Sequence, residues 1–319
     1  MRHFLNLMDV SATELIGLLD RAAELKKLRG RSNHPRSLSG KSIAILMEKA
    51  STRTRISFEV GVHELGGYPV PLASRDLQIG RDEPLDDTAR VLSRYLSAVV
   101  LRTHGHDRIE TLAAASHIPF INALTDKYHP CQLLADMMTV REHLEQGLEG
   151  AVVAWIGDGN NMAHSWILAA AQVGFEIRLA CPKGYQPDPD VLERAASTGR
   201  GQVHVTTDIE EAARGANVVT TDVWASMGQE GEAQARKQAF VGYCVTPDTM
   251  RLATPDAIFL HCLPAHRGEE VAAEVIDGPA SRVWDEAENR LHTQKALLEL
   301  ICGLDCAGGQ GRAGQGRAG

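Results

Sequence analysis

The sequence predicts an α/β protein with two domains, each a parallel β-sheet flanked by helices. Short apolar, often β-branched runs recur along the chain, and helical patterns separate nearly all of them, which is typical of parallel sheets. The chain has 319 residues, enough for two domains with separate cores. The alternation pauses once, at residues 130–147, where we expect a long helix between the domains.

The first expected element is a helix that begins after Ser11. Ser11 and Glu14 have the spacing of a capping box, and Gly30 is a suitable stop. Between them runs one apolar helical stripe, made of Leu15, Leu18, Leu19 and Ala22.

Strands are expected wherever the short apolar runs occur. These runs lie at residues 43–47, 68–72, 98–102, 119–123, 151–157, 175–181, 202–206, 218–223 and 258–263. The predicted domains are residues 1–146 and 147–285, and a last helix, 286–303, is expected to return to the first domain. The remaining residues, 304–319, form a low-complexity tail of Gly, Gln, Arg and Ala that we expect to be disordered and to which we assign no function.

Composition limits the class of partner. The net charge is −8, with a pI near 5.9, which argues against nucleic acid as the main partner. The chain has no apolar run of membrane-spanning length and no secretion signal at its start, so a cytoplasmic protein is expected. The six cysteines are scattered and are expected to be free thiols.

The sequence contains six polar clusters at positions that suit a ligand. Five of them follow expected strands, and one precedes the helix between the domains. In open parallel sheets, ligands bind beyond the carboxyl ends of the strands, so these clusters are the candidate site. They are Ser51–Arg55, Arg102, His129–Gln132, Gly157–Asn161, Asp222–Gly228 and His261–Pro264.

The first cluster, Ser-Thr-Arg-Thr-Arg at 51–55, stands between an expected strand and an expected helix. A helix start has unpaired N–H groups and a positive dipole end, so hydroxyls and a guanidinium placed there suit a phosphate. The alternative is a plain helix cap with arginines facing water, and the pentad alone does not decide between the two.

The other clusters also have simple alternatives when each is taken alone. Arg102 would be a surface or ion-paired arginine, His129 a turn residue or helix cap, and Cys262 a small buried hydrophobe. The run at 157–161 lacks the third glycine of a dinucleotide loop, and no acidic residue follows the next strand. His261 and His266 have no third ligand at a convincing spacing, so we expect neither a metal nor a cofactor.

Taken together, four of the clusters resemble the ornithine carbamoyltransferases, over about residues 3–303. Ser-Thr-Arg-Thr-Arg marks the wider aspartate/ornithine carbamoyltransferase superfamily, and His-Pro-Cys-Gln at 129–132 follows in order. Asp-Val-Trp-Ala-Ser-Met-Gly at 222–228 and His-Cys-Leu-Pro at 261–264 are the elements that indicate ornithine. The resemblance implies an active site in the cleft between two α/β domains and assembly as a homotrimer. It also implies that the protein synthesises citrulline as a step of arginine biosynthesis.

The resemblance also implies a role for each motif residue. Arg102, His129 and Cys262 would be catalytic. Carbamoyl phosphate would be held by Ser51, Thr52, Arg53, Thr54, Gln78, Arg102, His129, Pro130, Cys131, Gln132, Cys262, Leu263 and Arg290, and L-ornithine by Asn161, Asp222, Ser226 and Met227. An Asp222 carboxylate suits an α-ammonium group, and the Asn161 amide suits an α-carboxylate.

Two further expectations concern charge. Arg55 points one position further into the helix and is expected to form a structural ion pair rather than to bind a ligand. The thiol of Cys262 could accept a proton or hydrogen bond from the attacking amine if surrounding positive charge lowered its pKa.

Several alternatives stay open. No lysine occurs between Lys49 and Lys127, whereas aspartate carbamoyltransferases use one from this loop, which favours ornithine. A carbamoyltransferase for putrescine or an N-acylated ornithine, or a catabolic phosphorolysis of citrulline, would use the same carbamoyl phosphate half. A non-catalytic binding protein on this fold is less expected, because the set of polar residues is complete.

Overall fold

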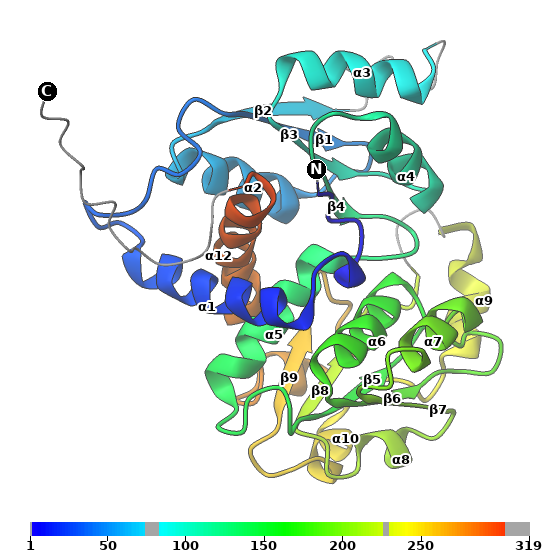
Figure 1. The fold of residues 1–319 in the computed structure, drawn as a ribbon. Helices are drawn as coiled ribbons and strands as arrows, with labels where there is room; N and C mark the ends of the chain where they lie inside the picture. The colour runs from blue at the N-terminus through cyan, green and yellow to red at the C-terminus, as the bar shows by residue number, and fades with distance from the viewer. Residues whose placement is uncertain (1, 74–82, 226–229, 304–319) are drawn as a thin grey trace, which may run out of the picture.

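The protein contains two parallel β-sheets, one toward each end of the molecule (Figure 1). The computed structural model describes residues 2–73, 83–225 and 230–303. The first sheet has the order β2-β1-β3-β4 and the second β7-β6-β5-β8-β9, with all named strand pairs parallel. The strands are β1 (Ser42–Met47), β2 (Tyr68–Ala73), β3 (Ala98–Arg102), β4 (Phe120–Leu124), β5 (Val152–Ile156), β6 (Glu176–Ala180), β7 (Gln202–Thr206), β8 (Val218–Thr221) and β9 (Ile258–His261).

Helices cover both faces of the first sheet, because its central strands are apolar on both sides. Ala44 and Leu46 of β1 pack against α3 (Leu85–Tyr95) and α4 (His106–Ala115). Ile43 and Ile45 face the opposite layer. That layer contains α1 (Ala12–Leu28), α2 (Thr52–Glu64), α5 (Pro130–His143) and α12 (Val283–Ile301).

The second sheet is sandwiched in the same way. Trp155 of β5 contributes to the core shared with α6 (Asn161–Val173) and α7 (Pro189–Ala196). Phe259 of β9 lies in a separate cluster on the other face, with α8 (Ile209–Ala213), α10 (Pro247–Leu252) and α11 (Ala273–Ile276). The short elements η1 (Leu7–Asp9), η3 (Glu230–Glu232) and α9 (Ala233–Ala239) complete the described helices.

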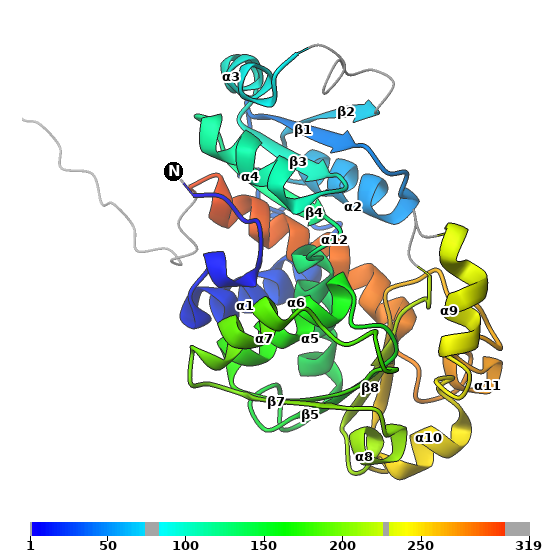
Figure 2. The same ribbon diagram turned by 90° about the vertical axis from the view of Figure 1, so that its right-hand side faces the viewer.

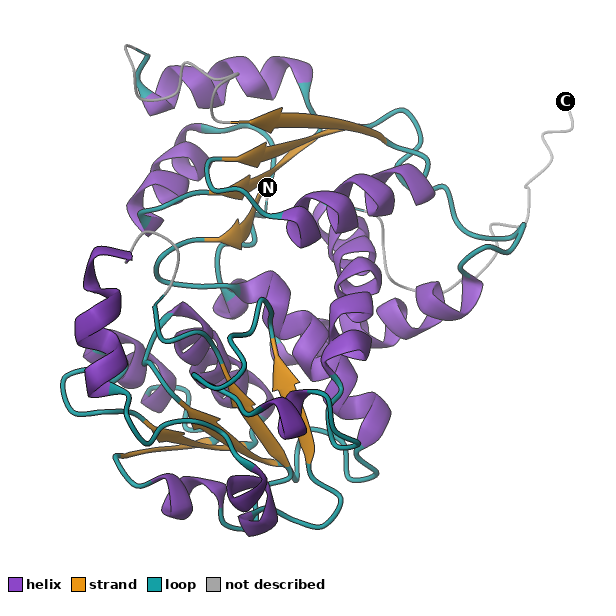
Figure 3. Ribbon diagram, turned by 180° about the vertical axis from the view of Figure 1, so that it is seen from behind, coloured by secondary structure: helices purple, strands orange, loops and turns teal. Residues whose placement is uncertain are grey.

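Helix α12 joins the two ends of the molecule. It starts beside β9 of the second sheet and then packs against α5, α2 and α1, as the side view shows (Figure 2). One buried apolar cluster runs from α1 through α5 to Trp155 and Trp166, so the layer between the sheets is a continuous core. Figure 3 shows the helices of this layer from behind.

The predicted fold class is confirmed. Each predicted strand is present, with bounds that differ by no more than two residues, and Ser11 and Glu14 form the predicted capping box. Helix α5 ends at His143 rather than near Gly147, and α12 begins at Val283, three residues before the predicted start. The exact division into domains stays a prediction, and the tail at 304–319 lies outside the described residues.

Two smaller expectations can also be compared with the structure. Cys131, Cys181, Cys244, Cys262 and Cys302 are free thiols, and Cys306 lies outside the described residues. Among the helices that the structure describes, none is both long enough and apolar enough to cross a membrane.

Candidate active site

Residues that follow strands of the first sheet meet residues that follow strands of the second. A guanidinium N–H of Arg53, just after β1, donates to the backbone carbonyl of Leu263, just after β9. Asn161, after β5, donates through Nδ2 to the carbonyl of Thr125, after β4, at 2.7 Å. Three of the predicted polar clusters therefore line one region between the sheets, together with the loop after β4.

The start of α2 has the geometry predicted for a helix cap. Ser51 is extended, and its Oγ accepts from the backbone N–H of Thr54 at 3.3 Å. The sequence left two interpretations of this pentad open, a cap and a phosphate cradle. Ser51 is a cap, and the neighbouring arginines decide whether it is also part of an anion site.

Three arginines converge beside this helix start. Arg102 is the last residue of β3, at a register shift between β3 and β4, and Arg290 comes from α12. Arg53, Arg102 and Arg290 each keep a buried Nε atom without a hydrogen-bond partner. The side-chain hydrogen bonds of Arg53 and Arg290 go to neutral oxygens, and within the described ranges none of the three forms an ion pair with a carboxylate. Three guanidinium groups without a directly paired carboxylate favour an anionic ligand.

The mutual repulsion of these arginines is visible in their pKa values. Burial, with Arg290 and Arg53 adding to it, lowers the pKa of Arg102 to about 10. Burial together with repulsion from Arg53 also lowers the pKa of Arg290. An anion bound between them would reverse both effects, because it would favour the charged guanidinium groups.

His129, at the cap of α5, is held neutral in this setting. Burial, followed by the charges of Arg290, Arg102 and Arg53, lowers its pKa well below the usual value. Its backbone N–H donates to Ser165 Oγ at 2.8 Å, and its ring Nδ1 is buried without a partner. A neutral imidazole can donate a hydrogen bond to a carbonyl oxygen without placing a fourth positive charge in the cluster.

Gln132 and Thr54 fix the orientation of Arg290. Arg290 donates through Nη1 to Gln132 Oε1 at 2.8 Å and through Nη2 to Thr54 Oγ1 at 2.7 Å. Both acceptors are buried, so the guanidinium is held by the first sheet's helices although it comes from the end of the chain.

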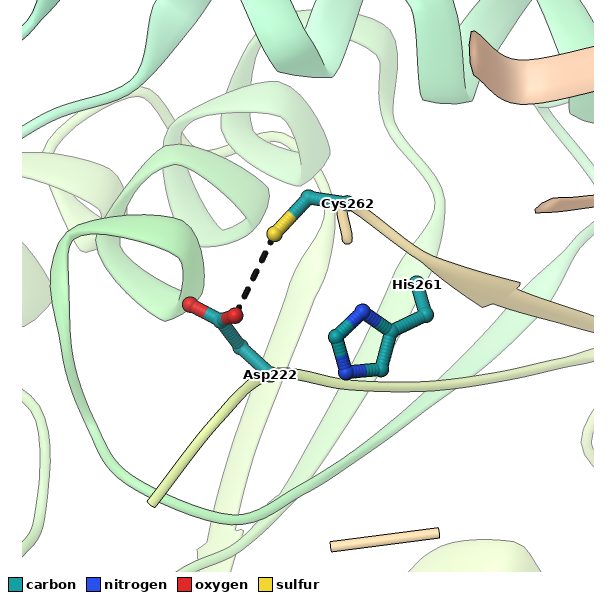
Figure 4. Close-up of side chains that lie close together, drawn as sticks. All are labelled: Asp222, His261 and Cys262. Atoms are coloured by element: carbon teal, nitrogen blue, oxygen red, sulfur yellow. Dashed lines mark hydrogen bonds between the residues drawn. The ribbon is translucent and has the colours of Figure 1, made fainter. Parts of the chain in front are cut away.

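On the other side of the site, Asp222 accepts several hydrogen bonds. Its Oδ1 accepts from the Cys262 thiol at 3.2 Å and from the N–H of Val223 at 2.8 Å, and its Oδ2 accepts from Asn160 at 3.0 Å. Figure 4 shows the Cys262 sulfur directed at the Asp222 carboxylate, with the His261 ring beside them and no hydrogen bond to either.

The condition under which the Cys262 thiol could accept a proton, a lowered pKa, is not met. Burial raises the pKa of Cys262 well above its ordinary value, and the carboxylates of Asp222 and Glu286 raise it further. Cys262 is therefore a thiol at neutral pH. It donates its proton to Asp222 in a hydrogen bond and cannot act as a base.

Leu263 has an unusual backbone. Its φ is +59°, in the left-handed region that non-glycine residues rarely adopt, and its N–H donates to His261 Nδ1 at 2.9 Å. Its carbonyl reaches Arg53, and the next peptide bond, to Pro264, is cis. Such a conformation at a candidate site indicates that the position of this carbonyl matters.

Several predicted residues are not placed in this region by a contact of their side chains. The Cys131 thiol donates to the carbonyl of Asn122 at 3.2 Å and packs in the core, so its predicted part in binding carbamoyl phosphate stays a prediction and would fall to its backbone. Burial raises the pKa of this thiol to about 12. Gln78, Ser226 and Met227 lie outside the described residues. Arg55 forms the predicted ion pair, with Glu59 at 2.6 Å.

Three residues of the region were missed by sequence reasoning. Asn160 caps α6 and also holds Asp222, whereas the sequence pointed only to its neighbour Asn161. Asp136 and Glu286 lie behind Gln132, which donates to both. Asp136 lies four residues after Gln132 on the same helix, and this spacing could have predicted their contact. No feature of the sequence predicts the contact between Gln132 and Glu286.

Two groups of side chains have metal-ligand character in the described chain, Asp222/His261/Cys262 and His266/Glu269/Glu270. In the first, both ring nitrogens of His261 are engaged, Nδ1 by Leu263 N–H and Nε2 by Glu270 at 3.3 Å. In the second, Glu269 is paired with Lys237 at 2.6 Å. Neither group is a free set of ligands.

The glycine loop after β5 lies against another backbone segment of the chain. A Cβ on Gly159 would lie 2.3 Å from the backbone nitrogen of Pro187 and 2.4 Å from the carbonyl carbon of Gln186. Glycine at this position is therefore explained by the close approach of the 186–187 backbone, without a ligand.

Comparison with known proteins decides the family. Residues 2–142 match the carbamoyl-P binding domain of the aspartate/ornithine carbamoyltransferases, and residues 149–301 match their Asp/Orn binding domain. The ornithine carbamoyltransferase of Pelobacter propionicus is 53% identical over 302 residues, covering 95% of this chain and 99% of its own. The chain belongs to the aspartate/ornithine carbamoyltransferase family.

Other members of this family are equally similar. The ornithine carbamoyltransferase of Acidothermus cellulolyticus is 54% identical and covers 98% of this chain and 99% of its own. Among solved structures, the enzyme from Pyrococcus furiosus superposes with a TM-score of 0.89 at 46% identity, covering 95% of this chain and 97% of the other. The carbamoyltransferase fold is retained at lower identity, as in the ornithine transcarbamoylase of Giardia lamblia, with a TM-score of 0.86 at 31% identity, covering 95% of this chain and 98% of its own.

Proposed function

We propose that this protein is an ornithine carbamoyltransferase, a transferase of one-carbon groups that converts carbamoyl phosphate and L-ornithine into L-citrulline and phosphate. One observation carries the proposal. Three arginines without a carboxylate partner surround a neutral histidine, directly opposite an aspartate that is hydrogen-bonded to a thiol. The names of the family's similar members, which specify ornithine, support the choice of acceptor.

Carbamoyl phosphate would bind at the start of α2. Its phosphate oxygens would accept from the free N–H groups of the first helical turn, from the hydroxyls of Ser51, Thr52 and Thr54, and from Arg53. Arg102, His129, Gln132 and Arg290 would surround the carbamoyl end. The two negative charges of the phosphate would compensate the unneutralised arginines.

The reaction is an acyl transfer without a cofactor. The neutral δ-amine attacks the carbonyl carbon, a C–N bond forms, the C–O bond to phosphate breaks, and the proton that the amine loses passes to the leaving phosphate. Negative charge develops on the carbonyl oxygen, so donors aimed at that oxygen lower the barrier. We assign this role to Arg102, His129 and Thr54, of which His129 donates while neutral.

Ornithine would bind on the side of the second sheet. Asp222 Oδ2 has one protein donor, Asn160, and can accept from the α-ammonium group as well. Asn161 would bind the α-carboxylate, and Ser226 and Met227 are further candidates by resemblance. Cys262 would lie beside the δ-amine as an uncharged thiol, whose sulfur can accept a hydrogen bond from the nucleophile.

We further propose that the protein acts in the cytoplasm as a homotrimer in arginine biosynthesis. A solved relative from Campylobacter jejuni, 40% identical, is described as an anabolic ornithine carbamoyltransferase. Exposed apolar side chains on α2, edge strand β2 and α3 support self-association through the first sheet. They are Ile56, Tyr68, Val91 and Tyr95.

The test is a product assay with several amines offered in parallel. The purified protein is incubated with carbamoyl phosphate and with ornithine, N-acetylornithine, putrescine or aspartate, and the carbamoylated product is measured. We expect citrulline from ornithine and little from the others. A preference for putrescine, acetylornithine or aspartate would overturn the assignment of the acceptor, and no product from any amine would overturn catalysis.

The variant Asp222→Asn sharpens this assay. Loss of the charge that pairs with the α-ammonium group should lower kcat/KM for ornithine roughly 10- to 100-fold. The slow reaction with N-acetylornithine, which has no α-ammonium group to pair with Asp222, should change much less. Equal losses for both amines would argue against the assigned role of Asp222.

A further inference from the structure

Two carboxyl groups lie side by side in the interior behind Gln132. Asp136 of α5 and Glu286 of α12 are each 1% exposed. The amide nitrogen of Gln132 donates to Asp136 Oδ1 and to Glu286 Oε1, both at 2.8 Å. The second oxygen of Glu286 accepts from the backbone N–H of His261 at 2.9 Å. The pair thus touches α5, α12 and β9.

These contacts settle which way the Gln132 amide faces. Its nitrogen is directed at the two acids, so its oxygen is directed at Arg290. The acids and Arg290 impose the same orientation, because a turned-over amide would present its N–H groups to a guanidinium, which has no acceptor, and its oxygen to the two acids.

Two such acids cannot both stay ionised at low cost. They are buried and accept from the same amide nitrogen of Gln132, and two carboxylates this close together in the interior repel each other, which favours a proton on one of them. Burial raises the pKa of Asp136 to about 7, and burial together with Asp136 raises the pKa of Glu286 well above its usual value. The charged or titratable groups that face the pair are Arg290 on α12, His261 and Cys262 at the end of β9, and Asp222 after β8.

We propose that Asp136 and Glu286 share one proton and act together as positioning residues, which fix the Gln132 amide so that Arg290 is held ready for carbamoyl phosphate. This inference rests on the proposed function. The acids touch no substrate themselves. They act through Gln132 and Arg290, and through His261 they connect the carbamoyl phosphate half of the site to the strand that carries Cys262.

Loss of the shared proton should weaken carbamoyl phosphate binding. Because burial and the neighbouring Asp136 raise the pKa of Glu286 well above its usual value, the pair keeps one proton at neutral pH and loses it as the pH rises further. The second negative charge then competes with the substrate for Arg290, the nearest cation. KM for carbamoyl phosphate should therefore rise above pH 7, by up to roughly tenfold per pH unit, while kcat changes little.

The variant Asp136→Asn separates this role from a structural one. Asparagine can accept from Gln132 through Oδ1 and donate to an ionised Glu286 through Nδ2, so it keeps the hydrogen bonds and one negative charge without any proton to lose. We expect a KM within about twofold of the wild type near pH 6.5 and no rise up to pH 8.5. A residue that only joins two helices would affect KM equally at every pH.

The matched control is Asp20→Asn. Asp20 lies on α1, is mostly exposed and pairs with Arg141 of α5. The control therefore removes the charge of an aspartate that contacts α5, the helix of Asp136, without touching Gln132. This control should keep the wild-type pH dependence. An unchanged rise of KM in Asp136→Asn would overturn the proposal.

A readout that needs no turnover distinguishes this proposal from the proposed function. The infrared band of a protonated carboxyl group, recorded for the resting protein at pH 7, should be present in the wild type and in Asp20→Asn and absent from Asp136→Asn. Binding of inorganic sulfate, whose charge is constant in this pH range, should weaken above pH 7 in the wild type and not in Asp136→Asn.

The two failures are therefore distinct. If no amine yields a carbamoylated product, the proposed function fails, and the infrared and sulfate measurements still decide whether the pair holds a proton and controls the anion site. If citrulline is made but the wild type shows no protonated carboxyl band at pH 7, the shared proton is disproved. This last measurement uses the wild-type protein, so it stands even if Asp136→Asn does not fold.

Discussion

Arg53 and Arg55 lie two positions apart on α2 and differ in what surrounds them. Arg55 is exposed and pairs with Glu59 one turn later. Arg53 has no carboxylate partner among the described residues. Its guanidinium donates instead to the backbone carbonyl of Leu263, which follows a strand of the second sheet. The same residue type therefore has a structural role at one position and a proposed ligand role at the other.

We expect Arg53→Ala to raise KM for carbamoyl phosphate at least roughly 30-fold, because a charged hydrogen-bonding partner is removed from a desolvated anion. Arg55→Ala, the matched control on the same helix, should change KM less than about twofold, because exposed ion pairs contribute little. Steady-state kinetics at saturating ornithine measure both. Near-wild-type kinetics for Arg53→Ala would remove it from the phosphate site.

Cys262 is expected to react slowly with alkylating reagents at neutral pH. Only the thiolate reacts, and burial together with Asp222 raises the pKa of this thiol well above its ordinary value. The rate of iodoacetamide modification at Cys262, followed by peptide mass spectrometry, should rise only at pH values above about 9.

Asp222→Asn provides the control for this measurement. With one of the two nearby carboxylates neutral, the pKa of Cys262 should fall, and the alkylation curve should move to lower pH. Fast modification of wild-type Cys262 at pH 7 would mean that the thiol is ionised in solution and that the base role excluded above must be reconsidered.

At the scale of elements, the loop after β5 shows how a motif can be misleading. Its two glycines resemble part of a dinucleotide loop, but Gly159 is there because the backbone at 186–187 passes against it. Close approach of two protein segments demands the same residue type as close approach to a phosphate.

We expect Gly159→Ala to lower the free energy of unfolding by at least about 1–3 kcal/mol, because its Cβ would overlap backbone atoms that cannot turn aside. The control is Gly17→Ala in α1, where a Cβ meets nothing within 4 Å. That change should be neutral or stabilise by up to about 1 kcal/mol through helix propensity. Urea unfolding compares the two, and equal stabilities would show that the 186–187 segment moves freely.

The elements themselves were predictable because their signals are local. Apolar runs such as Ile43–Met47 become buried strands, and Ser11 with Glu14 fixes a helix start. Helix ends were less predictable. No glycine or proline stops α5 at His143, and Val283 and Trp284 extend α12 backwards with no cap signal that the sequence displays.

The candidate site was predictable in its motifs but not in its contacts. Strand ends in parallel sheets gather polar residues, so Arg53, His129, Asp222 and Cys262 could be grouped. The partnership of Gln132 with Glu286 joins residues 154 positions apart, which no local pattern encodes. The pKa of the Cys262 thiol depends on its burial and on carboxylates from distant parts of the chain. No local pattern in the sequence shows that these raise it.

At the scale of the whole molecule, buried histidines set the response to acid. Burial, followed by the charge of Lys295, lowers the pKa of His292 on α12 to about 4. Burial likewise lowers the pKa of His3, His106, His129 and His164. The unfolded chain binds protons at these groups from about pH 6.5 downward, before the folded protein does. Stability that is present above pH 6.5 is therefore lost as the pH falls toward 4.

We expect His292→Gln to reduce this loss, by up to about 1.4 kcal/mol of unfolding free energy per pH unit across that window. The free energy of unfolding at pH 7, 6, 5 and 4 measures the slope. His204→Gln, whose side chain is more than half exposed on β7, is the control and should leave the slope unchanged. A His292→Gln slope equal to that of the wild type would show that this histidine is protonated without unfolding.

The return of α12 has a consequence for how the chain is made. Arg290, Gln294 and Leu297 come far later in the chain than α1, α2 and α5, yet they fill the layer that these helices form. On the ribosome, the first sheet can form while its inner surface still lacks this cover, and that surface stays uncovered until α12 leaves the exit tunnel. A nascent chain arrested before residue 283 should therefore expose this apolar surface to solvent. It should bind ribosome-associated chaperones until α12 emerges and covers the surface in their place.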